Sequence, residues 1–208
     1  MKRFLAPILL LTLLFPALAM GETMDDLVIT NGLYYKKYTE VPFTGKVTGK
    51  TQGSFKNGQK HGFWVEYDRD GRVSKKVSNK NGKENTYVEY RYYDNGQLHS
   101  KVTYKDGKED GPWIEYHKNG KLDFKGTYKD GKRGGPWVYY HKDGQLWSKG
   151  TYKDGKRDGP WVYYHKDGQL RYKGNWKNDK RDGPWVSYHD DGQLKFKGNF
   201  KDGKKIFN

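Results

Sequence analysis

From residue 111 to residue 205 the sequence repeats itself every 24 residues. Each copy opens with Gly-Pro-Trp and continues with Tyr-His, an Asx-Gly pair, a leucine and a Lys-Gly pair. Such a period is typical of arrays in which each unit packs only on its neighbours, so it excludes a fold built around one asymmetric core. Worn copies precede this stretch: they begin at Pro42-Phe43-Thr44-Gly45, and Glu89 stands where a tryptophan is expected. We therefore divide the mature chain into a lead-in (20–41), degenerate repeats (42–110), regular repeats (111–205) and a short end (206–208).

Two turn signals in each unit predict β-hairpins. Asn-Gly and Asp-Gly pairs supply the positive φ values that a two-residue type I′ turn requires. Proline lacks an N–H, which places Pro136 at the first position of a strand that continues through Trp137 to His141. The second strand is expected from about Leu146 to Tyr152, and no segment after the leader has the 3.6-residue apolar period of a helix. The predicted fold is all-β: an elongated, twisted antiparallel sheet of tandem hairpins.

Aromatic residues supply about half of the hydrophobic content, so we expect them to form the packing between units. Gly150 is expected beneath a neighbouring ring, where no side chain fits. We expect the tryptophans to seal adjacent hairpins, although an exposed ring such as that of Trp147 would also stack on a sugar. The predicted structural core comprises Trp113, Tyr116, Leu122, Tyr128, Trp137, Tyr140, Leu146, Tyr152, Trp161, Tyr164, Leu170, Trp176, Trp185, Tyr188, Leu194 and Phe200. The predicted turn glycines are Gly120, Gly144, Gly168, Gly192, Gly131, Gly155 and Gly203.

The first 19 residues have the layout of a secretory signal peptide. Lys2 and Arg3 precede an apolar run from Phe4 to Phe15, and Ala17-Leu18-Ala19 has the small-x-small pattern of a cleavage site. The apolar run is shorter than the ~20 residues that a transmembrane helix needs. We expect cleavage before Met20, no membrane span in the mature chain, and a periplasmic or secreted location. The chain has no cysteine, which excludes disulfides, thiol enzymes and cysteine-ligated metal sites.

The stretch from Tyr172 to Gly183, Tyr-Lys-Gly-Asn-Trp-Lys-Asn-Asp-Lys-Arg-Asp-Gly, resembles a MORN repeat. Asp179 replaces one glycine of that pattern, and Gly-Pro-Trp stands where the family has Gly-x-Gly, which resembles the bacterial variant of the repeat. The resemblance covers roughly residues 42–205. It implies an elongated sheet of successive hairpins and a binding or scaffolding role, with no reaction. The Phe43-Thr44-Gly45 opening also resembles proteins of this class known as antitoxin components of toxin–antitoxin systems, a role that fits poorly with export.

Candidate catalytic and metal sites are weak. Histidines recur at 117, 141, 165 and 189, but equivalent residues two strands apart are separated by about 10 Å, too far for one metal ion. Asp68-Arg69-Asp70-Gly71 resembles the start of a calcium loop, yet Asn79 occupies the position of the bidentate glutamate, so an Asx-Gly turn explains it better. Glu66, Glu89 and Tyr90 in the worn units have no visible activating partner. We predict that the chain is not an enzyme and has no cofactor and no metal.

Because the chain has a net charge of +15, rows of basic residues are candidate binding surfaces. Equivalent lysines are expected about 10 Å apart along the sheet, which would attract anionic lipid or glycan. The candidate anion-binding residues are Lys132, Arg133, Lys156, Arg157, Lys180 and Arg181. Such lysines also protect sheets against aggregation, which is the simpler explanation for them. Nucleic acid is a poor partner for an exported chain with no recognised nucleic-acid module.

Together these observations predict an exported, non-enzymatic repeat protein that acts as a protein–protein scaffold or adaptor in the cell envelope. Its expected partner is another envelope or secreted protein. The alternative is recognition of an anionic lipid or a cell-surface polysaccharide through basic and aromatic rows. A further alternative, from the family resemblance alone, is an antitoxin-like or immunity-like neutraliser.

Overall fold

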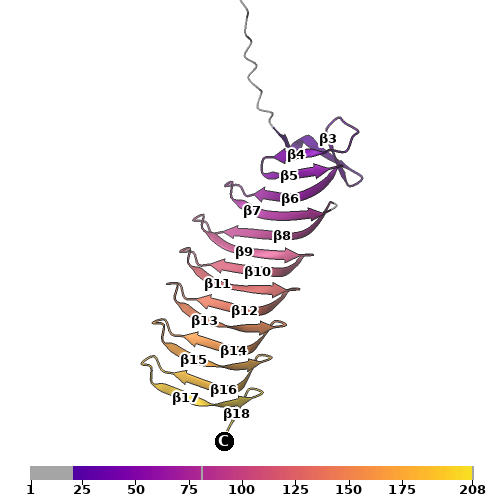
Figure 1. Ribbon diagram of the computed structural model, residues 1–208. Helices are drawn as coiled ribbons and strands as arrows, with labels where there is room; N and C mark the ends of the chain where they lie inside the picture. The colour runs from indigo at the N-terminus through magenta and orange to yellow at the C-terminus, as the bar shows by residue number, and fades with distance from the viewer. Residues whose placement is uncertain (1–20, 81, 208) are drawn as a thin grey trace, which may run out of the picture.

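The computed structural model describes residues 21–80 and 82–207, and the predicted signal peptide lies outside these residues. One 16-stranded sheet runs the length of the molecule, and from β4 onward its strands are paired in the order in which they follow along the chain (Figure 1). Every pairing in it is antiparallel except that of β1 with β4. The prediction of an elongated sheet of tandem hairpins is confirmed.

Two kinds of connection alternate between consecutive strands of the sheet. The strands of the degenerate region are β4 (Gly45–Thr48), β5 (Thr51–Lys56), β6 (Gln59–Tyr67), β7 (Val73–Lys80), β8 (Lys83–Tyr92) and β9 (Leu98–Lys105). The strands of the regular region are β10 (Lys108–Tyr116), β11 (Leu122–Lys129), β12 (Lys132–Tyr140), β13 (Leu146–Lys153), β14 (Lys156–Tyr164), β15 (Leu170–Lys177), β16 (Lys180–Tyr188), β17 (Leu194–Lys201) and β18 (Lys204–Ile206).

The two turn signals of each unit form different turns. Asp130 and Gly131 both have positive φ, 48° and 77°, and connect β11 to β12 as the predicted type I′ turn. At the other end of the unit the same prediction is wrong, because only Gly144 of the Asp143-Gly144 pair has a positive φ. There the Asp143 carboxylate accepts a hydrogen bond from Gln145 N at 3.0 Å, so the chain takes a longer turn closed by its own side chain.

The proline of each unit lies within its strand instead of at the start. β12 begins four residues before Pro136, and its register with β11 shifts between the pairs Lys125–Val138 and Thr127–Gly134. Pro136 therefore lies at a bulge on the β11 side while it still pairs with Thr151 on the β13 side. A bulge accommodates proline here because the missing N–H would point to a position where the ladder is already interrupted.

The lead-in folds against the first strands of the array. β1 (Glu22–Thr23) pairs with β4, a 3₁₀ turn (Met24–Asp26) follows, and β2 (Leu27–Thr30) and β3 (Leu33–Lys36) form a separate hairpin. This segment supplies Leu27 to the one cluster of buried aliphatic and aromatic side chains at this end. The cluster consists of Leu27, Val47, Phe55, Trp64 and Val77, with Met24, Tyr34, Phe43 and Tyr87 packed against it.

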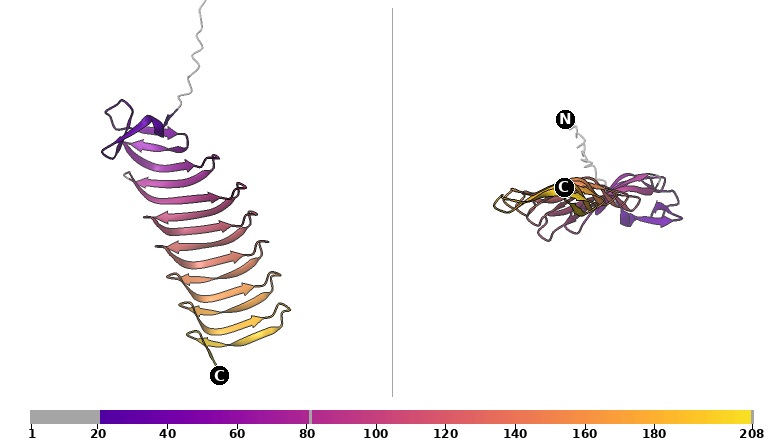
Figure 2. Two further views of the ribbon diagram at one scale, coloured as in Figure 1. Left: turned by 180° about the vertical axis from the view of Figure 1, so that it is seen from behind. Right: turned by 90° about the horizontal axis from the view of Figure 1, so that it is seen from below.

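Beyond this end the described residues form a single sheet without a second layer. The view along the long axis shows a thin ribbon, with both faces of the regular strands open (Figure 2). Among the described residues, no helix has the length and apolarity to cross a bilayer. Any function of the regular repeats therefore depends on the two faces and two edges of this sheet.

Candidate functional site

The face that carries the tryptophans, called here the aromatic face, holds the array together. Trp161 is 1% exposed, and a Cβ placed on Gly150 of the preceding strand would lie 2.1 Å from its ring. The indole Nε1 donates to the Thr151 carbonyl oxygen at 3.1 Å. The prediction that Gly150 lies beneath a ring is confirmed. Because the indole is buried against backbone, this tryptophan has no ring face to offer a sugar.

The contact of an indole with a glycine recurs along the array. Trp137 lies over Gly126 and Trp185 lies over Gly174. These two tryptophans are buried, as is Trp161, and most of the other predicted core side chains are half-buried. The half-buried residues are Trp113, Tyr116, Leu122, Tyr128, Tyr140, Leu146, Tyr152, Tyr164, Leu170, Trp176, Tyr188 and Phe200. Leu194 is 56% exposed, so its assignment to the core is wrong: it starts β17, where no further unit of the array packs over it.

Three arginines cover rings on the aromatic face: Arg133, Arg157 and Arg181. The Arg133 guanidinium lies 4.7 Å from the Trp137 ring centre and donates hydrogen bonds to the hydroxyls of Tyr128, Tyr139 and Tyr152. Burial raises the pKa of Tyr139 above its usual value, and the hydrogen bond with Tyr152 adds to this effect. Arginine suits this position because its flat cation stacks on rings and its five donors reach several hydroxyls at once.

The glycine missing from the third regular unit has a structural consequence. Asp179 has a φ of 65°, and its carboxylate accepts hydrogen bonds from the backbone N and the Nε of Arg157, both at 3.0 Å. Burial by itself raises the pKa of the Asp179 carboxyl group. The two hydrogen bonds from Arg157 outweigh this effect and hold the pKa of Asp179 below its usual range. The guanidinium also lies 3.5 Å from the Trp176 ring centre. The ion pair thus offsets part of the strain of a non-glycine residue in the left-handed region.

These contacts divide the six predicted anion-binding residues into two groups. Arg133, Arg157 and Arg181 lie against rings of the aromatic face, Arg181 at 4.4 Å from the Trp185 ring centre. Lys132, Lys156 and Lys180 begin their strands beside the two-residue turns and are exposed. The arginines are therefore engaged with rings of the array, and the six residues do not form one patch.

The opposite face of the sheet, called here the open face, carries a row of lysines in the middle of the strands. Val162 of β14 pairs with Lys149 on one side and with Lys173 on the other. Since neighbouring residues of a strand point to opposite faces, these lysines point away from the face on which Gly150 lies beneath its ring. The full row, in spatial order, is Lys101, Ile114, Lys125, Val138, Lys149, Val162, Lys173, Val186 and Lys197.

The five lysines of this row have no acidic partner. Within residues 21–80 and 82–207, none of them has a carboxylate oxygen within 4.0 Å. Two of the lysines near the turns of the same strands are paired: Lys129 lies 2.8 Å from Asp110, and Lys201 lies 3.1 Å from Asp182. The unit therefore places its ion pairs at the edge of the sheet and leaves the middle of the open face positively charged.

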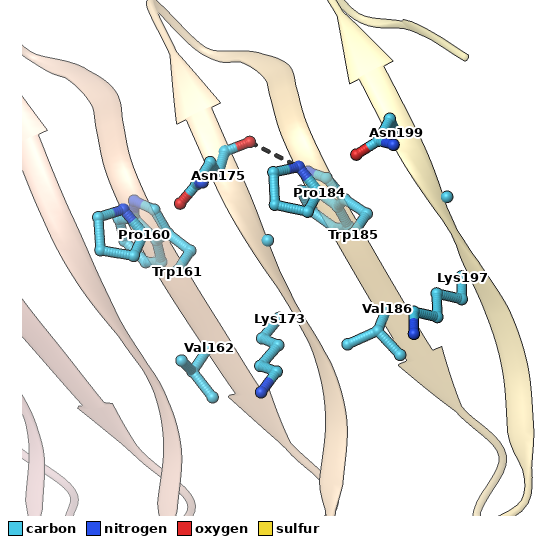
Figure 3. Close-up of a pocket in the computed structure, with 12 residues that line it drawn as sticks. Pro160, Trp161, Val162, Lys173, Asn175, Pro184, Trp185, Val186, Lys197 and Asn199 are labelled. Atoms are coloured by element: carbon cyan, nitrogen blue, oxygen red, sulfur yellow. Dashed lines mark hydrogen bonds between the residues drawn. The ribbon is translucent and has the colours of Figure 1, made fainter. Parts of the chain in front are cut away.

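A second row on the open face runs beside the lysines. Pro160 pairs with Asn175 and Pro184 pairs with Asn199, at positions two residues along the strands from the lysine row. Figure 3 shows these prolines and asparagines, with Lys173 lying between two valines. They line a shallow groove of about 630 Å³ in the last two regular units. The open face thus combines apolar contact area, amide groups and unpaired cations.

The recurring histidines lie at the loop edge of the sheet. His117 Nε2 is 3.3 Å from the Tyr140 carbonyl oxygen, and His165 Nδ1 is 3.1 Å from the Asp190 carboxylate. His141 is half-buried and His189 is exposed. In the described part of the chain, no three histidine, aspartate or glutamate side chains are grouped closely enough to hold a metal ion.

The candidates in the worn units are engaged in the sheet. The Asp68 carboxylate accepts hydrogen bonds from Asp70 N, Arg72 N and Arg72 Nε at 2.7–2.9 Å, which makes it part of a turn. Glu66 pairs across strands with Lys75, which in turn pairs with Glu89. Tyr90 pairs with Lys101 of the open-face row.

The sequence matches the model of the MORN repeat variant family in five segments, at residues 88–106, 109–130, 133–154, 157–178 and 181–202. These segments cover just over half of the 208 residues. No curated protein matches the chain.

Two solved structures share a distant likeness. One is described as accessory secretory protein 1, 2 and 3 in Streptococcus pneumoniae, with 16% identity and a TM-score of 0.29 over 48% of this chain and 18% of that one. The other is a GtfA/B complex bound to UDP and GlcNAc, with 21% identity and a TM-score of 0.22 over 60% of this chain and 22% of that one. This chain spans less than a quarter of the length of either protein.

Proposed function

This chain belongs to the MORN repeat variant family, and from that premise we propose that it is a binding scaffold whose open face holds a macromolecule along the length of the sheet. One observation carries the proposal: the two faces have different tasks. The aromatic face buries Trp137, Trp161 and Trp185 and thereby joins the units. The lysines and prolines of the open face are exposed from β11 onward, and the sheet does not need them for its packing.

We further propose that the scaffold is exported and carries out no reaction. Export is supported by the signal-peptide pattern of residues 1–19. Cleavage after residue 19 removes Lys2 and Arg3 and leaves a net charge of +13 on the mature chain (38 basic against 25 acidic residues). The absence of a reaction is supported by repetition, since catalysis needs an asymmetric constellation and the same residues recur in every unit. The partner is then a component of the cell envelope. A neutraliser of a cytoplasmic toxin, the role implied by the resemblance of the Phe43-Thr44-Gly45 opening to antitoxin components, does not fit this location.

The location is tested by the N-terminus of the protein recovered from cells. Mass spectrometry is expected to find a mature chain that starts at Met20 in the periplasm or the medium. Deletion of residues 2–19 is expected to retain the protein in the cytoplasm. An uncleaved chain in the cytoplasm would refute export.

The binding face is tested by photo-crosslinking in living cells. A crosslinking residue at position 162 lies on the open face, and one at position 147 lies among the rings of Tyr139 and Tyr163 on the aromatic face. We expect a crosslinked species of higher mass from position 162 and none from position 147. Equal yields from both positions, or yield from position 147 alone, would contradict the assignment of the open face.

A further inference from the structure

The lysine row of the open face has a regular pitch. Lys125, Lys149 and Lys173 lie on every second strand and are separated by one valine each. With strands about 4.8 Å apart, the cations recur about every 10 Å along the long axis of the sheet. The valine between two lysines supports their aliphatic stems, so the ammonium groups stand above an apolar floor.

The lysines of this row form no ion pair among the described residues, and Lys101 alone has a ring contact, at 6.0 Å from the Tyr90 ring centre. No carboxylate of the described residues lies within 4.0 Å of these lysines, while two lysines at the turn edge, Lys129 and Lys201, are paired. A solubilising surface has no need of a single file, because the interspersed charges of the edges and loops already provide it. Five cations in line without a carboxylate partner point to a ligand that carries anions in line.

We infer that the open face binds a linear acidic polysaccharide, laid along the lysine row across the strands. A polymer with one anion per ~10 Å places one charge opposite each lysine. The neighbouring row suits its sugars: Pro160 and Pro184 offer flat apolar contact, and Asn175 and Asn199 offer amide groups to hydroxyls. This inference rests on the proposed function, since it names the ligand of the same face.

Two other partners fit the row less well. A bilayer presents anions over a plane, so it would be bound as well by scattered lysines as by a single file. A folded protein presents charges at irregular spacing, and its interface core is depleted of lysine. The regular pitch and the single file therefore favour the polymer, and the two other partners become outcomes of the test.

The test uses the mature chain and hyaluronan oligosaccharides of increasing length, which carry one carboxylate per disaccharide. Calorimetry at low salt is expected to show an affinity that rises with length until the oligosaccharide spans five lysines, and then levels off. Binding is expected to weaken as salt is added, because exposed ion pairs are screened. Absence of binding at low salt, or affinity independent of length, would overturn the inference.

A matched pair of variants tests the row itself. The first carries Lys125→Gln, Lys149→Gln and Lys173→Gln, and the second carries Lys118→Gln, Lys142→Gln and Lys166→Gln in the exposed loops. Both lose three charges, and circular dichroism with thermal unfolding verifies that both fold. The row variant is expected to bind about tenfold more weakly, the size expected for three exposed ion pairs, and the loop variant less than about threefold. Equal losses would overturn the inference, because they would show that net charge alone attracts the polymer.

A third arm separates the inference from the proposed function. Vesicles of phosphatidylglycerol and phosphatidylcholine replace the polysaccharide in the same titrations, and we expect no dependence on the row. Row-dependent binding to vesicles, without binding to hyaluronan, would overturn the inference. If a protein is crosslinked at position 162 and no polysaccharide binds, the polysaccharide inference is overturned as well. The scaffold proposal would then still stand. Crosslinking at position 147 alone would refute the scaffold proposal first.

Discussion

The two ends of this sheet bury their hydrophobic residues in different ways. Near the N-terminus, Leu27 of the lead-in covers Val47, Phe55 and Val77, and the result is a small core with residues on both sides. In the regular repeats no second layer exists: Trp137, Trp161 and Trp185 each lie over a glycine, and arginines cover the rings of Trp137 and Trp185. A single-layer sheet therefore excludes water by close contact of a ring with the backbone, where a layered protein uses aliphatic packing.

The largest test of this difference removes one indole. Trp161→Ala is expected to cost about 3–5 kcal/mol, the usual range for a buried tryptophan. Because repeats contact only their neighbours, hydrogen exchange is expected to accelerate in β13–β15 while the core around Val47 remains protected. The control is Trp147→Ala, the same substitution at a ring that is 39% exposed, with an expected cost of about 1 kcal/mol. Uniform loss of protection along the whole sheet would contradict the distinction between the two ends.

A smaller effect is expected when the glycine beneath the ring is changed. Gly150→Ala brings a methyl group 2.1 Å from the Trp161 ring and is expected to cost about 2–3 kcal/mol through overpacking. Gly134→Ala is the matched control, because nothing lies within 4 Å of a Cβ at that position. Chemical unfolding of both variants measures the difference. Equal stabilities would mean that the ring can move away from the backbone.

Alkaline pH tests whether the rings of the array are as well shielded as those of a layered core. Burial raises the pKa of Tyr172 to about 12, and the neighbouring Tyr163 contributes, with ring centres 4.2 Å apart. An unfolded tyrosine ionises near pH 10, so between pH 10 and 12 the unfolded state loses a proton that the folded state keeps. Stability is expected to fall over this window, as measured by melting temperature. Tyr172→Phe is expected to make the decline shallower, and an unchanged slope would refute the shielding.

The smallest expected effect concerns the turn that lacks its glycine. Asp179→Ala removes the ion pair with Arg157 and keeps a side chain at positive φ, so it is expected to cost about 1 kcal/mol. Asp179→Gly removes the ion pair and also the strain, and is expected to change stability by less than about 0.5 kcal/mol. Thermal unfolding compares the two. A large loss for the glycine variant would mean that the ion pair contributes more than an exposed pair normally does.

The sequence predicted the hairpin array and the indole over Gly150 because the 24-residue period makes every unit repeat the same local evidence. It did not predict the hairpin of the lead-in, although Asn31-Gly32 is a type I′ signal between Thr30 and Leu33. That segment occurs once, so nothing in the period marked it. The turn at Asp143 was predicted wrongly because the same Asx-Gly pair serves two turn types, and the choice depends on a side-chain hydrogen bond.

The candidate site was predicted only in outline. Rows of lysines follow from the period, but the turn-edge residues chosen as the anion site include arginines that stack on rings. The row without carboxylate partners consists of Lys149 and its equivalents, the lysines that directly precede the repeated glycine. Strand alternation carries the signal that would have found it, because a glycine beneath a ring places the preceding residue on the other face. Ion pairing at the edge, which distinguishes free from occupied lysines, depends on register and could not be read from composition.

The order of the strands in the sheet also has a consequence for how the protein forms. From β5 to β17 each strand pairs with the strands before and after it in the chain, so no long loop has to close before a hairpin gains its partner. Assembly can therefore start at the lead-in and advance hairpin by hairpin, each finished edge acting as the template for the next segment to emerge. A chain that appears gradually, from a ribosome or through a narrow pore, suits such growth, because every newly released unit finds its docking edge already in place.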